Sequence, residues 1–159
     1  MTLARDLALV GCILAACTAD TTSGDASPQV RRILSDDRYD WKMLEGSGTQ
    51  IHFPAGSFAD AHREVLRGRV ESALREVGRV LGRPPGEEIL HVFYVDGRDD
   101  MEALTGTPVT GYSYFDDNAL ALVFNAEWSP FERHELAHVL TLGGWPDPGD
   151  MAVVEGLAT

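Results

Sequence analysis

A long amphipathic segment, residues 57–81, limits the folds open to this chain more than any other stretch. Apolar side chains recur there at helical spacing, while arginine and glutamate side chains fill the other face. The apolar positions are Phe58, Ala61, Val65, Val70, Ala73, Leu74, Val77 and Leu81. Ser57 followed by Asp60 is a capping-box start, and the sequence GRPPG at 82–86 ends the pattern. We therefore expect one long helix that begins near residue 57.

Segments with strand character lie on both sides of this helix. The sequence ILHVFYV, residues 89–95, is apolar enough for a central strand. Residues 39–53 predict two short strands around a Gly-Ser-Gly turn, and residues 111–125 predict a hairpin that turns at Asp116-Asp117-Asn118. Residues 97–106 predict a short helix. This order predicts an α+β fold with a small mixed or antiparallel sheet, rather than a doubly wound sheet.

The first seventeen residues differ in character from the rest of the chain. Leu7–Ala16 is an unbroken run of apolar and small residues, too short to span a bilayer but suited to the apolar region of a secretory signal. The run ends in Leu-Ala-Ala-Cys17, which resembles a bacterial lipoprotein signal, where the cysteine is lipidated and becomes the N-terminus. A plain secretory signal or a short anchor is the alternative. We expect residues 1–17 to be a lipoprotein signal peptide, with Cys17 anchoring an exported protein to a membrane of the cell envelope.

The composition of the remaining chain suggests a tether followed by one domain. Residues 18–35 begin with a stretch rich in Ser, Thr, Gly and Asp that predicts a flexible tether, and the globular domain is expected at 36–159. Both cysteines, Cys12 and Cys17, fall in the signal segment, so the domain has no thiol pair for a disulfide. Its stability must come from an apolar core, a metal, or both. The net charge of −12 repels phosphate backbones, which argues against nucleic acid as a partner.

Residues 130–142 predict a second well-defined helix. Ser129, Pro130 and Glu132 form a helix start, with serine as the cap, proline in the first turn and glutamate three residues after the cap. Gly143-Gly144 ends the helix.

Three residues of this helix form an HExxH pattern. His134 and His138 are four residues apart, so both lie on one helix face and can offer a ring nitrogen to one point. Zinc binds histidine and carboxylate ligands and keeps one position for water in catalytic sites. Glu135 is near enough to deprotonate such a water, as in zinc metallopeptidases. The pattern therefore predicts a zinc site that requires a third ligand.

Several positions could supply that third ligand. Metzincin-type peptidases carry it six residues after the second histidine, where this chain has Gly144, so that pattern fails. Asp147 and Asp150 are carboxylates, but they lie in a turn close to the helix and are not preferred.

The sequence HELAHVL followed by EGLA resembles the gluzincin superfamily, especially the bacterial peptidase MA-like domains found on secreted proteins and lipoproteins. The resemblance covers about residues 128–158. It implies that His134, His138 and Glu155 bind zinc and that Glu135 is the general base. It also implies that the segment NALALVFN, residues 118–125, is the edge strand along which an extended peptide lies.

The chain departs from the gluzincin pattern in three places. Ala152 replaces a common tryptophan, and the spacing from the second histidine to Glu155 is short. The sequence ends four residues after Glu155, whereas gluzincins continue with helices that complete the cleft and supply an oxyanion-stabilising side chain. We therefore expect a fragment or a shortened relative.

Two functional hypotheses follow. The first is zinc-dependent hydrolysis of a peptide or protein substrate by a water that Glu135 activates. The second is a catalytically inactive, zinc-stabilised binding module on the cell surface. Tyr112 and Tyr114 are candidate oxyanion donors, but alternate aromatic residues on a strand more often serve packing. His52, His62 and His91 lack ligand spacing, and His91 is expected to be a core or sheet-face residue.

Overall fold

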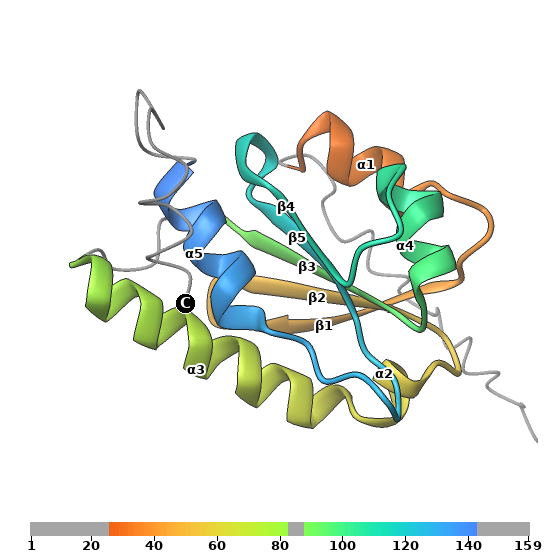
Figure 1. Ribbon diagram of the computed structural model, residues 1–159, viewed down its shortest axis with the longest axis horizontal. Coiled ribbons are helices and arrows are strands. Elements are labelled where there is room, and N and C mark those ends of the chain that lie inside the picture. Colours follow the sequence, from red (N-terminus) through yellow and green to blue (C-terminus); the bar gives the residue numbers. More distant parts are fainter. Residues whose placement is uncertain (1–25, 83–87, 143–159) are drawn as a thin grey trace, which may run out of the picture.

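The computed structural model describes residues 26–82 and 88–142. Within them a five-stranded mixed sheet has helices on both faces, which is the α+β fold expected from the sequence (Figure 1). The helices are α1 (Pro28–Leu34), α2 (Phe58–Ala61), α3 (Arg63–Leu81), α4 (Arg98–Thr105) and α5 (Glu132–Leu142). The strands are β1 (Trp41–Gly46), β2 (Thr49–Pro54), β3 (Leu90–Val95), β4 (Gly111–Tyr114) and β5 (Ala119–Val123). No helix in these two ranges is long and apolar enough to cross a membrane.

The strands follow the order β1-β2-β3-β5-β4 across the sheet. β2, β3 and β5 are parallel to one another, and β1 and β4 pair antiparallel at the two edges. The predicted central position of residues 89–95 is confirmed, because β3 is the middle strand and all six of its residues are buried. The two predicted hairpins are also confirmed. The second turns through Asn118, whose φ of 45° is in the left-handed region that asparagine tolerates.

The expectation that the segment 118–125 forms an edge strand is wrong. β5 is hydrogen-bonded to β3 on one side and to β4 on the other, and all five of its residues are buried. A strand that is apolar along its whole length is stable only when both of its faces are covered, and β5 is covered on both. β4 forms the edge instead, and only Ser113 among its four residues is buried.

The predicted long helix is divided into two at His62. Ser57 caps α2 by accepting a hydrogen bond from the backbone N–H of Asp60. The Nδ1 of His62 then donates to the carbonyl oxygen of Phe58 at 2.8 Å, and the ring packs on Phe58. The break changes which side chains of α3 face the sheet. Val65, expected on the apolar face, is 58% exposed, whereas Leu66 is fully buried.

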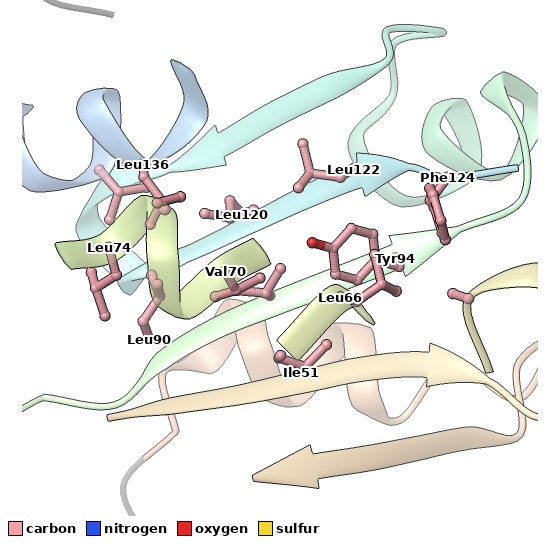
Figure 2. Close-up of a cluster of buried hydrophobic side chains, with 14 of the residues drawn as sticks. Ile51, Leu66, Val70, Leu74, Leu90, Tyr94, Leu120, Leu122, Phe124 and Leu136 are labelled. Atoms are coloured by element: carbon pink, nitrogen blue, oxygen red, sulfur yellow. The ribbon is translucent and has the colours of Figure 1, made fainter. Parts of the chain in front are cut away.

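Each face of the sheet has its own apolar cluster. On one face, α3 and α5 pack over β2, β3 and β5, and Figure 2 shows Leu66, Val70 and Leu136 among the side chains that meet there. On the other face, α1 and α4 pack on the sheet through side chains such as Val30 and Met101. Burial of each such side chain stabilises the fold by roughly 1.5–3 kcal/mol.

The folded domain begins earlier than the sequence pattern predicts. Residues 28–34, within the range expected to be tether, form α1 with Ser27 as its N-cap. Val30 is fully buried and Ile33 is 2% exposed. Two apolar side chains on one short helix gave too weak a periodic signal against the polar segment before it. Residues 28–34 of the predicted tether are therefore helical and packed against the sheet.

The helix that carries the HExxH pattern starts later than expected. α5 begins at Glu132 rather than at residue 130. Ser129 Oγ accepts a hydrogen bond from Arg69, and the Glu132 carboxylate is paired with the same arginine. The side chains expected to form a capping box thus contact α3 instead.

Candidate functional site

His134 and His138 lie one turn apart on α5, and their Nε2 atoms are in contact. The two Nε2 atoms are 3.1 Å apart, the ring centroids are 4.7 Å apart and the ring planes differ by 80°. If the two nitrogens pointed at each other along one line, the centroids would lie farther apart. The rings are therefore tilted to the line between the two nitrogens, which still lie within hydrogen-bonding distance of each other. With Zn–N distances of about 2.0–2.1 Å, nitrogens at this separation subtend roughly 100° at a zinc ion, close to tetrahedral.

A second histidine pair has the same distance between its ring nitrogens but a different ring orientation. His52 Nε2 and His91 Nδ1 are also 3.1 Å apart, but their centroids are 5.4 Å apart and their planes differ by only 16°. These rings lie end to end with nearly parallel planes, and one neutral imidazole can donate its N–H to the other. Burial, with a smaller contribution from His91, lowers the pKa of His52 to about 3. This pair is part of the core, as expected for His91.

Glu135 is held against the edge strand. Ser113 Oγ lies 2.6 Å from Glu135 Oε2 and 3.1 Å from the Glu135 carbonyl oxygen. The carboxylate also lies over Gly111, where an added Cβ would be only 2.3 Å from Oε1. Glu135 and His134 are both half-buried, so α5 presents a carboxylate and a ring nitrogen at one partly open position.

A buried ionic contact fixes the start of α5. Glu132 is 6% exposed, and its carboxylate accepts two hydrogen-bonding contacts from the Arg69 guanidinium of α3, each at 2.9 Å. Tyr94 of β3 donates its hydroxyl to the same carboxylate at 3.2 Å. Burial, together with the charge of Glu132, raises the pKa of Tyr94 well above its ordinary value. The contact joins α3, β3 and α5 two residues before His134.

Two of the three HExxH residues, His134 and Glu135, border a cleft of about 630 Å³. Its walls include Gly111 of β4, His134 and Glu135, and the rings of Trp128 and Phe131, which are 47% and 78% exposed. A larger groove of about 830 Å³ between α3 and α5 reaches His134 but not Glu135. The cleft beside β4 is therefore where a bound molecule could meet both side chains.

Two predicted site residues, Cys17 and Glu155, lie outside the described residues. In the two described ranges, no group of three or more His, Cys, Asp or Glu side chains gathers where it could hold a metal. Among the described residues, His134 and His138 are thus the two predicted zinc ligands that can be placed.

The two tyrosines of β4 are not placed to act at this site. Tyr112 and Tyr114 pair with Ala121 and Ala119, on the sheet face covered by α1 and α4. Their rings pack 4.8 Å apart, and Tyr114 reaches the Leu104 carbonyl of α4. They serve packing, whereas α5 lies over the opposite face.

Sequence reasoning missed Ser113 as a site residue. Successive side chains of a strand point to opposite faces of the sheet. Ser113 lies between Tyr112 and Tyr114, so the sequence could have placed it on the face opposite to theirs. Only the position of α5 over that face, however, reveals that the hydroxyl meets Glu135.

Comparison of the chain with protein-family models gave no match, and comparisons with curated proteins and with solved structures gave no significant match. Only the sequence pattern and the geometry of the site therefore bear on the function of this protein.

Proposed function

We propose that this protein is a zinc-dependent peptidase of gluzincin type. The HExxH pattern on α5 carries the proposal, because it places the Nε2 atoms of His134 and His138 3.1 Å apart, a separation that two ligands of one zinc ion can have. The neighbouring carboxylate of Glu135 borders the same cleft as His134.

The donor set suits zinc. His134 and His138 would hold the ion with Glu155 as the third ligand, the set implied by the resemblance to gluzincins. When bound, zinc supplies Lewis-acid polarisation of a substrate carbonyl and lowers the pKa of water. Two imidazole nitrogens together with one carboxylate oxygen are a common set of protein ligands for zinc.

The protein's own groups would orient the substrate and move protons. The outer side of β4 has no strand partner among the described residues, so its backbone N–H and C=O groups can pair with an extended peptide. Glu135 would accept a proton from the attacking water and return it to the leaving amine. Trp128 and Phe131 would cover apolar side chains of the peptide in the cleft.

The proposed setting is the cell envelope. A lipid on Cys17 would anchor the protein to a membrane, and the apolar run that precedes this cysteine supports export. Substrates would then be peptides or proteins outside the cytoplasm, and the net charge of −12 disfavours nucleic acid.

Substitution of the base tests the proposed reaction. In Glu135→Gln the zinc ligands remain, so zinc content is expected to equal that of the parent, while hydrolysis of an unstructured protein falls by at least about a hundredfold. Cleavage is measured by release of new amino termini. Full activity in this variant would overturn the mechanism. Bound zinc without hydrolysis by the parent would instead favour the non-catalytic surface module.

A further inference from the structure

The strongest unassigned feature of the site is the contact between Ser113 and Glu135. Ser113 is 8% exposed and faces α5 from the middle of β4. Its hydroxyl is 2.6 Å from Glu135 Oε2, a short distance typical of an O–H donated to a charged carboxylate. The same oxygen is 3.1 Å from the Glu135 carbonyl, so both acceptors within reach belong to one residue.

Gly111 completes the surroundings of this carboxylate. It lies two positions before Ser113, on the same side of β4, and its missing side chain leaves the space that Glu135 occupies. An alanine there would bring a Cβ to 2.3 Å from Oε1 and 2.9 Å from the carboxyl carbon. Glu135 is thus bonded by one residue of the edge strand and confined by another.

We propose that Ser113 is a positioning residue that fixes the Glu135 carboxylate against the edge strand for proton transfer. This inference rests on the proposed peptidase function. β4 would align the extended peptide, and β4 also holds the Glu135 carboxylate. The same strand would therefore set the distance between the scissile bond and the carboxylate. A displacement of about 1 Å at such a site can cost two orders of magnitude in rate.

Ser113→Ala tests this role, with Ser113→Thr as the matched control. Threonine retains the hydroxyl and suits a strand, whereas alanine removes only the donor. In Ser113→Ala we expect kcat to fall about tenfold or more, with KM within about twofold of the parent and zinc content unchanged. Ser113→Thr is expected to recover most of kcat.

A second readout does not depend on turnover. In the zinc-free full chain, the carboxyl ¹³C resonance of Glu135 is assigned by its loss in Glu135→Gln. Loss of the hydroxyl in Ser113→Ala is expected to shift that resonance, and Ser113→Thr is expected to leave it near the parent position. Gly111→Ala is expected to shift it too, because the added Cβ conflicts with the carboxylate.

The outcomes separate the two proposals. An unchanged kcat and an unchanged resonance in Ser113→Ala would overturn the positioning role, as would a loss that Ser113→Thr does not repair. A parent protein with no hydrolytic activity would overturn the proposed function and, with it, the role in proton transfer. The resonance would then still report whether the hydroxyl holds the carboxylate.

Discussion

At the scale of single residues, ring orientation separates two histidine pairs that have the same nitrogen–nitrogen distance of 3.1 Å. The ring planes of His52 and His91 differ by 16°, whereas those of His134 and His138 differ by 80°. The i,i+4 spacing of the second pair was visible in the sequence. The first pair joins residues of two strands, 39 positions apart, and only the register of β2 against β3 brings them together.

The buried pair predicts a dependence of stability on pH. Burial lowers the pKa of both histidines in the folded protein, that of His52 to about 3, from a value of about 6.5 in the unfolded chain. Stability is therefore full above pH 6.5 and declines as the pH falls below it, because the unfolded state binds more protons. Between about pH 7 and about pH 5, we expect a loss on the order of 1–2 kcal/mol in the free energy of unfolding.

Urea denaturation of the parent and of His52→Phe at these two pH values measures this loss of unfolding free energy. The ring centroids of His52 and Phe93 are 4.7 Å apart, and the rings are stacked. Phenylalanine at position 52 keeps an aromatic ring beside Phe93 but cannot bind a proton. The variant should show a smaller loss of stability on acidification. An equal loss in both proteins would show that His52 does not contribute. The carboxyl groups of Asp36 and Asp60, whose pKa values are lowered mainly by Arg38 and by Gly56, titrate below this window.

At the scale of elements, α5 is fixed by side chains that the sequence assigned to its cap. The sequence located α5 to within two residues, because Ser129-Pro130 and Gly143-Gly144 are local start and stop signals of a helix. It could not show that Glu132 pairs with Arg69, since that contact spans 63 positions. The hairpin of β4 and β5 was also predicted from the sequence. Which of its two strands forms the sheet edge depends on which one pairs with β3, and that pairing is not a local signal.

Removal of the arginine should therefore loosen α5. In Arg69→Met the Glu132 carboxylate stays buried without its cation, and we expect a loss of about 2–3 kcal/mol, moderated by the partial exposure of Arg69. In Arg69→Met/Glu132→Gln the uncompensated charge is gone while Tyr94 keeps a hydrogen-bond acceptor, so part of the loss should return. Chemical denaturation measures both. Additive losses from the two substitutions would contradict a coupled pair.

At the scale of the whole molecule, the sequence predicted the fold class and most elements, because alternation and helical spacing are local signals. It did not predict α1, a short helix whose two buried side chains, Val30 and Ile33, give little periodic signal. For the candidate site, the sequence indicated the two histidines and the glutamate of α5. It could not indicate Ser113 and Gly111, whose roles depend on the packing of α5 against an edge strand.

The central claim is that His134 and His138 bind zinc, and zinc content of the purified protein tests it most directly. Elemental analysis is expected to give about one zinc per chain in the parent, close to none in His138→Ala, and the parent value in His52→Phe, because His52 is buried in the core beside His91. Folding of each variant is checked by circular dichroism. A folded parent without zinc, or zinc that persists in His138→Ala, would contradict the account.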